Sequence, residues 1–234
     1  YSLGGSSLCN DCDAGTLSDP GSSSCVACSP GEVPSADGLK CEKCSPGTSA
    51  KHGEAVCTPC KHGFAMNSTG SAFCNVCEAG TYSSADTTTC IACPSGTWSG
   101  TAAQSCTSCE KGKYSVKPVG NTECISCETY ISGTTTLKES ASEPAADCVC
   151  QEGYFMMDNN QTLSDNGREC LKCETGMNCT SQGVVLQSLV LDENYWRSSL
   201  NSGVVLACPD GSGCVSTTID NGTIASCSEG YQGP

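Results

Sequence analysis

Residues 74–82 read C-N-V-C-E-A-G-T-Y, residues 90–98 read C-I-A-C-P-S-G-T-W, and residues 106–114 read C-T-S-C-E-K-G-K-Y. In each copy two residues separate a pair of cysteines, a glycine stands three residues after the second cysteine, and an aromatic residue follows two positions later. Successive copies begin 16 residues apart. Self-similarity at a fixed period is typical of repeat architectures, so the sequence predicts an array of small units.

The C-x-x-C pair occurs eight times in residues 9–127, mostly at intervals of 16 residues. A glycine held at one phase predicts a turn with positive φ or a close approach of two backbones. About a dozen residues rich in Ser, Thr, Gly and Ala separate the pairs, which is enough for a short two-stranded hairpin. A unit of this size cannot bury a face alone, so we expect stacking and cross-links to hold it.

The composition excludes a large hydrophobic core. The chain has 234 residues, of which 24 are cysteine and 5% are aromatic. Cysteine at this density predicts a disulfide scaffold in an oxidising compartment. A net charge of −14 without a basic patch argues against binding nucleic acid. The longest apolar run, residues 184–191, is too short and too interrupted for a membrane span, so we expect a secreted or surface-exposed chain with no span of its own.

The period changes after Cys127, where the glycine is missing and the loop extends to Cys148. Residues 148–155 read C-V-C-Q-E-G-Y-F, which is how the last third of an EGF-like module reads, with Cys150 closing on Cys170. The sequence therefore predicts tandem repeats in residues 1–128 and an EGF-like transition module in residues 129–173.

Residues 174–234 are predicted to form a C-terminal cysteine-rich module with a small core of its own. Its best strand candidates are residues 184–191 and 204–207, which lie on either side of the sequence Y-W-R at 195–197. The chain ends in an EGF-like pattern that stops before its closing cysteine, so we expect an excised piece of a longer protein.

The C-x-x-C-x-x-G-T-Y-S units, over residues 9–173, resemble the ephrin-receptor-like cysteine-rich repeats of the growth-factor-receptor and TNF-receptor-like, EGF-like group. The tail, from Y-W-R at 195–197 to G-Y-Q-G-P at 230–234, resembles a segment that follows such repeats in large surface proteins of protists and algae. The resemblance implies extracellular, disulfide-bonded, elongated modules and supplies no catalytic residues. The predicted fold class is small and disulfide-rich: an elongated rod of tandem short β-hairpin or EGF-like cysteine repeats with a compact C-terminal module.

The cysteine pairs allow three interpretations. Their spacing lies within the range of zinc knuckles, but eight tandem pairs with only two histidines in the chain favour disulfides. A redox-active C-x-x-C would occur once, at the start of a helix, and no helical period surrounds these pairs. Among disulfide schemes, an interleaved pairing (Cys9–Cys25 with Cys12–Cys28) stays open beside a local one.

The local scheme joins the second cysteine of each pair to the first cysteine of the next and leaves Cys9 and Cys227 facing outward past the two ends. Its predicted bonds are Cys12–Cys25, Cys28–Cys41, Cys44–Cys57, Cys60–Cys74, Cys77–Cys90, Cys93–Cys106, Cys109–Cys124, Cys127–Cys148 and Cys150–Cys170.

Four sequons predict N-linked glycans in an extracellular chain, at Asn67, Asn160, Asn178 and Asn221. Threonine runs at residues 87–89 and 134–136 suit O-linked glycans.

Three aromatic residues, Tyr82, Trp98 and Tyr114, share one phase of the repeat. We interpret each ring as a cover for the neighbouring disulfide rather than as a ladder for sugars or a partner strand. Asp192 and Glu193 are interpreted as solvated carboxylates rather than calcium ligands. We predict no catalytic residue, no metal ligand and no cofactor.

The expected function is that of a non-enzymatic extracellular structural glycoprotein, a rod-like building block of a fibre, surface coat or appendage. Its expected partners are further copies of itself or other extracellular proteins. The alternative is the ectodomain stalk of a membrane-anchored receptor or adhesion protein.

Overall fold

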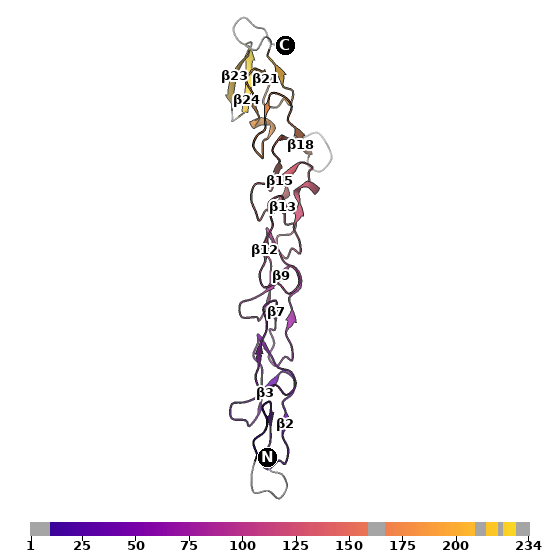
Figure 1. The fold of residues 1–234 in the computed structure, drawn as a ribbon, viewed down its shortest axis with the longest axis vertical. Helices are drawn as coiled ribbons and strands as arrows, with labels where there is room; N and C mark the ends of the chain where they lie inside the picture. Colours follow the sequence, from indigo (N-terminus) through magenta and orange to yellow (C-terminus); the bar gives the residue numbers. More distant parts are fainter. Residues whose placement is uncertain (1–9, 159–166, 209–213, 220–221, 228–234) are drawn as a thin grey trace. The chain divides into compact units, whose positions relative to one another are not determined.

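The fold is built almost entirely from short hairpins (Figure 1). A computed structural model describes residues 10–158, 167–208, 214–219 and 222–227. Each described sheet has two strands that are consecutive in the chain. The helical elements of the described residues include a four-residue α-helix, α1 (Pro144–Asp147), and the 3-10 turns η1 (Cys127–Thr129) and η3 (Leu186–Ser188). These features confirm the prediction of a small, disulfide-rich fold of tandem short hairpins.

The strand pairs follow the order of the sequence. They are β1 (Thr16–Leu17) with β2 (Val26–Ala27), β3 (Glu32–Pro34) with β4 (Cys41–Lys43), β5 (Thr48–Ser49) with β6 (Thr58–Pro59), β7 (Phe64–Ala65) with β8 (Asn75–Val76), β9 (Thr81–Ser83) with β10 (Cys90–Ala92), β11 (Thr97–Trp98) with β12 (Thr107–Ser108), β13 (Lys113–Tyr114) with β14 (Ile125–Ser126), β15 (Thr134–Thr136) with β16 (Cys148–Cys150), β17 (Tyr154–Asp158) with β18 (Arg168–Lys172), β19 (Met177–Asn178) with β20 (Val190–Leu191), β21 (Tyr195–Trp196) with β22 (Leu206–Ala207), and β23 (Cys214–Ile219) with β24 (Gly222–Cys227).

The chain forms two compact units. The first comprises Tyr1–Thr107 and Lys117–Glu123, and the second comprises Ser108–Val116 and Cys124–Pro234. Within the first unit the hairpins follow one another in chain order (Figure 1). The boundary between the units falls at the seventh repeat, inside the segment that the sequence assigns to tandem repeats.

The glycine of each repeat has a defined role in the turn before the first strand. In the fifth repeat the backbone N–H of Thr81 donates to the carbonyl of Glu78 at 3.0 Å, and Gly80 between them has a φ of 86°. A type II turn requires positive φ at its third residue, and glycine adopts it without steric cost. The Oγ1 of Thr81 donates to the same carbonyl at 2.7 Å. The recurring G-T is therefore a turn signal.

The same glycine also brings distant repeats into contact. The N–H of Gly80 donates to the carbonyl of Ser99 in the next repeat at 2.8 Å, and the N–H of Gly120, one repeat further, donates to Cys93 at 2.8 Å. A Cβ on Gly80 would lie 2.5 Å from the carbonyl oxygen of Gly120, so no larger residue fits without movement of the backbone. Each repeat is thus coupled to the next and to the one after it.

An apolar cluster lies in the second unit, and it combines the C-terminal segment with residues 155–173, which the sequence assigns to the transition module. It includes Phe155 and the buried side chains of Val184, Leu186, Leu189 and Leu191. These four are spaced by two, three and two residues, which does not fit a strand. The prediction of one strand over residues 184–191 is wrong except at β20.

The 3-10 turn η3 replaces the first part of the predicted strand. The Oγ of Ser188 accepts from the N–H of Val185 at 3.4 Å and donates to its carbonyl at 3.2 Å. A serine hydroxyl that bonds to nearby backbone competes with strand pairing, which explains why the strand does not form here.

Candidate functional site

Disulfides form the chemical framework of both units. The nine bonds of the local scheme are all present in the structure, and most of them span 13 residues. The second cysteine of a pair is buried, as Cys77 and Cys93 show, whereas its partner at the end of the loop is more exposed. Each bond therefore fastens an outer loop to the interior of the stack. Cys9 lies outside the described residues, and only the backbone of Cys227 is described.

Two further disulfides were not predicted. Cys173 is bonded to Cys179 and Cys208 to Cys214, and each bond spans six residues. Both lie beyond the regular period, so the repeat spacing does not reveal them. Their shared separation of six residues is the one signal that the sequence offers.

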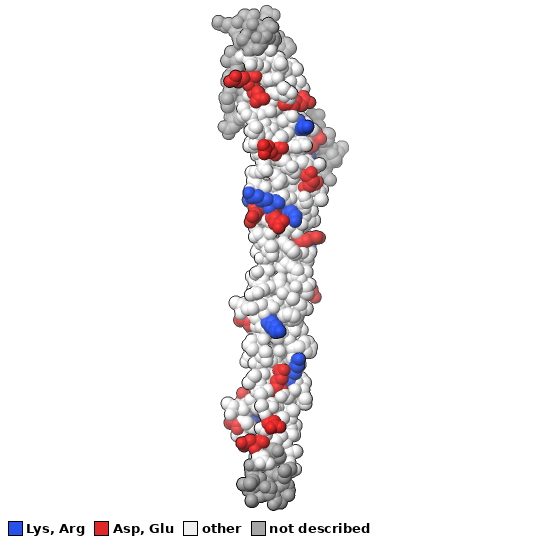
Figure 2. Space-filling view, viewed as in Figure 1, with Lys and Arg blue, Asp and Glu red and all other residues white. Residues whose placement is uncertain are grey.

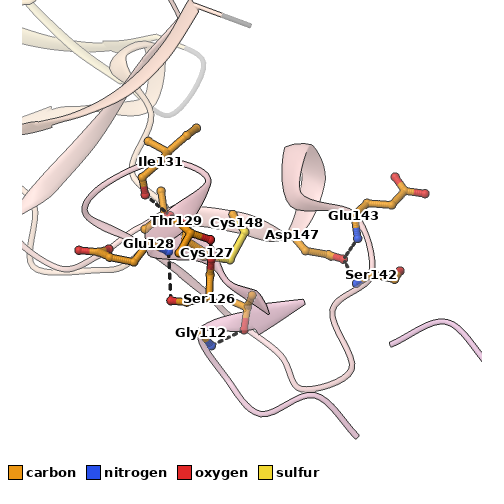
Figure 3. Close-up of a disulfide and its surroundings, with 12 residues drawn as sticks. Gly112, Ser126, Cys127, Glu128, Thr129, Ile131, Ser142, Glu143, Asp147 and Cys148 are labelled. Carbon is orange, nitrogen blue, oxygen red and sulfur yellow. Dashed lines mark hydrogen bonds between the residues drawn. A yellow bond between two sulfur atoms is a disulfide. The ribbon is translucent and has the colours of Figure 1, made fainter. Parts of the chain in front are cut away.

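The eighth repeat shows what replaces the missing glycine (Figure 3). After Cys127 the chain enters η1, and the Oγ of Ser126 caps this turn by accepting from the N–H of Glu128 at 3.3 Å. The ring of Tyr114, which is 8% exposed, packs against Cys127 and Cys148. Tyr114 therefore covers the neighbouring Cys127–Cys148 disulfide, as we interpret its ring from the sequence.

The other two aromatic residues of that phase are less enclosed. Tyr82 and Trp98 are half-buried, and their backbones form isolated bridges to Ala103 and Asn121 in the following repeat. Their backbones therefore belong to the contact between neighbouring repeats, and their half-exposed rings enclose a disulfide less fully than Tyr114 does.

A carboxylate anchors the loop that precedes Cys148 (Figure 3). One oxygen of Asp147 accepts from the backbone N–H groups of Ser142 at 2.8 Å and Glu143 at 3.0 Å, and the other pairs with Lys138 at 2.8 Å. Burial raises the pKa of this carboxyl, but the hydrogen bonds from Lys138, Glu143 and Ser142 together outweigh burial. The pKa of Asp147 therefore lies below its ordinary value.

A buried arginine closes the core of the second unit. Arg197 is 1% exposed, and its guanidinium donates to the carbonyl oxygens of Leu186 at 2.6 Å and Leu189 at 3.1 Å. A weaker bond reaches Leu200 at 3.3 Å. Leu186 begins η3 and Leu189 follows it, so the guanidinium bonds carbonyls at both ends of this turn. Burial lowers the pKa of Arg197 below its ordinary value.

The sequence does not predict this role of Arg197, which appears there only as the third residue of the motif Y-W-R. Gly222 of β24 lies against η3 and the guanidinium: a Cβ there would overlap the carbonyl oxygen of Gln187 and stand 3.0 Å from Nη2 of Arg197. The carbonyls that it binds come from a segment predicted to be a strand, so no pattern pointed to them.

Two of the four predicted glycan acceptors are described, and both are exposed. The Oδ1 of Asn67 accepts from the hydroxyl of Ser68 at 3.1 Å. The Oδ1 of Asn178 accepts from the hydroxyl of Thr180, the third sequon residue, at 2.9 Å. Asn160 and Asn221 lie outside the described residues.

Acidic side chains outnumber basic ones over the face drawn in Figure 2. Among the described residues, three or more His, Cys, Asp or Glu side chains nowhere gather as a metal site would require. Within the same part of the chain, no helix has the length and apolar character needed to cross a membrane.

Two open clefts lined by described residues contain aromatic side chains. One, of about 450 Å³, lies in the second unit and is lined by apolar side chains that include Phe155, Met157 and Met177. The other, of about 320 Å³, lies in the first unit between the third and fourth hairpins. No protein-family model matches the chain, and a search of curated proteins finds no match. The resemblance to ephrin-receptor-like repeats stays a prediction.

Proposed function

We propose that this chain is a non-enzymatic structural glycoprotein of the extracellular space, a building block of a fibre, surface coat or appendage. The observation that carries the proposal is the coupling of the hairpins. Each is closed by a disulfide and hydrogen-bonded to the next, as Gly80 is to Ser99. The stability of such an array is a sum of local and neighbour terms, so its length is not limited by the growth of a core.

Cysteine chemistry supports the extracellular part of the proposal, because disulfides persist in oxidising compartments. The acidic surface keeps single copies soluble before they assemble. Exposed Asn67 and Asn178 are suitable acceptors for N-linked glycans. The partners are further copies of this chain or other extracellular proteins.

Electron microscopy of the secreted, unreduced and glycosylated chain tests the structural role. We expect filaments or sheets with a regular repeat, which disappear when the disulfides are reduced and alkylated. Separate particles at every concentration would contradict the proposal. That outcome favours the alternative, an ectodomain stalk of a membrane-anchored receptor or adhesion protein.

Intact-mass analysis before and after glycosidase treatment tests the glycans separately. Asn67→Gln is expected to remove one glycan mass from the secreted chain. The matched control is Asn201→Gln, since Asn201 is exposed but lies in no sequon. If Asn67→Gln removes no glycan mass, Asn67 is not an acceptor. If glycosidase also leaves the mass of the wild-type chain unchanged, the chain carries no N-linked glycan.

A further inference from the structure

The cleft of the first unit combines exposed aromatic surface with positive charge. Its volume is about 320 Å³, and Phe64, Phe73 and Pro59 form its apolar walls. The ring of Phe73 is 68% exposed, in a chain with only three phenylalanines. Together with Phe64 and Pro59, Phe73 gives the cleft an apolar surface that an occupant would cover.

Two lysines stand at the rim of this cleft, Lys51 and Lys61, and both are exposed. Glu54 also lines it, but its carboxylate accepts from the backbone N–H of Lys51 at 2.9 Å and so serves its own loop. The charged lining residues sum to one positive charge, whereas the whole chain carries −14. The cleft therefore favours an acidic occupant.

The second unit presents a suitable acidic group. Asp192 and Glu193 are the only two acidic residues that are adjacent in the sequence, and both are exposed. They lie in the turn between β20 and β21. The N–H of Asp192 donates to Gly176 at 2.9 Å, and buried Leu191 precedes it, so the two carboxylates stand on a fixed base.

We propose that the cleft at Lys51, Lys61 and Phe73 binds the Asp192–Glu193 turn of a second copy of this chain. This inference rests on the proposed structural function and names the contact by which copies join. The two surfaces differ, so the contact is heterologous, and repetition of a heterologous contact produces rings or open filaments. Because the whole chain carries a net charge of −14, the overall electrostatic interaction between copies is repulsive, and a contact that pairs opposite charges offsets part of that repulsion.

Charge reversal on either side tests the contact in the full secreted chain. The variants are Lys51→Glu/Lys61→Glu and Asp192→Lys/Glu193→Lys, and sedimentation velocity and light scattering measure assembly over a concentration series. Each variant alone is expected to assemble about tenfold or more weakly than the wild type, because attraction becomes repulsion at both side chains. An equimolar mixture of the two variants is expected to assemble again, since each reversed surface then meets an oppositely charged one.

Controls with the same change in charge are available on both sides. Lys111→Glu/Lys117→Glu and Glu139→Lys/Glu152→Lys alter exposed side chains outside the cleft and the turn. Both are expected to assemble as the wild type does. Resistance to alkylation without reductant checks that every variant keeps its disulfides.

The outcomes separate this contact from the structural role. A wild-type chain that assembles while the reversed variants assemble equally well overturns the contact and leaves the structural role in place. Reversed variants that fail to recover in the mixture also overturn it. A wild-type chain that stays monomeric at every concentration overturns both the contact and the structural function.

Discussion

Replacing Gly80 by alanine is expected to loosen the coupling between the fifth and seventh repeats. Gly80 has a φ of 86°, and a Cβ there would stand 2.5 Å from the carbonyl oxygen of Gly120. The left-handed backbone costs an alanine about 1–2 kcal/mol, and overpacking against fixed backbone costs about 1–3 kcal/mol. We therefore expect Gly80→Ala to lower the local free energy of opening by about 2–5 kcal/mol.

Native-state hydrogen exchange measures this effect where it occurs. The amide of Gly120 is bonded to the carbonyl of Cys93, and the amide of Cys93 to the carbonyl of Gly80, both at 2.8 Å. In an array without a shared core, a local opening energy is better defined than a single unfolding transition. Exchange at these two amides is expected to accelerate about 30-fold or more.

Substitutions at two other glycines separate the cost of the positive-φ backbone from the cost of the close approach to Gly120. Gly38 has a φ of 68° but nothing within 4 Å of an added Cβ, so Gly38→Ala tests the cost of the backbone conformation alone. Gly100 has neither feature, and Gly100→Ala is expected to be neutral or slightly stabilising. If Gly80→Ala accelerates local exchange no more than Gly38→Ala does in its own turn, the close approach to Gly120 is not what requires glycine.

Three further substitutions test the second unit by native-state hydrogen exchange in the secreted chain, which measures the local free energy of opening. Arg197→Met removes this donor from the carbonyls of buried Leu186 and Leu189 and is expected to lower the local free energy of opening by about 2–5 kcal/mol. Unchanged exchange around η3 would contradict this role of Arg197. Asp147→Asn is expected to cost about 1–2 kcal/mol at neutral pH. Because the pKa of Asp147 is depressed, its contribution is complete above the ordinary value of 3.8 and is lost as the pH falls through the folded value, so wild type and variant should converge in that acid range. Tyr114→Ala removes the ring over Cys127–Cys148 and is expected to cost about 3–5 kcal/mol, whereas loss of less than about 1 kcal/mol would mean that the ring is not a packed cover.

The sequence predicts what is local in this fold and misses what depends on tertiary contact. Cysteine spacing and the phase of glycine are local, so the hairpins and the turn at Gly80 follow from them. Arg197 binds carbonyls 8 and 11 residues earlier in the chain, and no periodic pattern marks that distance. The close approach of Gly80 to Gly120 likewise arises only after the repeats have stacked, so the sequence shows that a glycine is needed without showing what it meets.

The glycan acceptors could be predicted because their signal is equally local. A sequon is three residues long, so Asn67 and Asn178 can be found without knowledge of the fold. The first-unit cleft could not be found in this way, because Lys51 and Phe73 come from successive hairpins and meet only across their boundary. A binding surface of this kind is lined by two neighbouring repeats, so the sequence of a single repeat does not reveal it.

A chain without a large core must hold its repeats in position by other means. The second strand of each hairpin, which lies between the two cysteines of a pair, contributes to this with its cysteines rather than with the two residues between them. The first cysteine of a pair closes the preceding loop, and the second, which is buried, begins the next repeat. The two residues between them are exposed in β6, β8 and β10, and they read T-P, N-V and I-A. The scaffold therefore constrains these positions only weakly, and they are free to serve contacts with other molecules. Pro59 of β6, which forms a wall of the first-unit cleft, is such a residue. Scaffold and contact surface are thus carried by different positions of the same repeat, which lets an array keep its stacking while its surface is adapted to assembly.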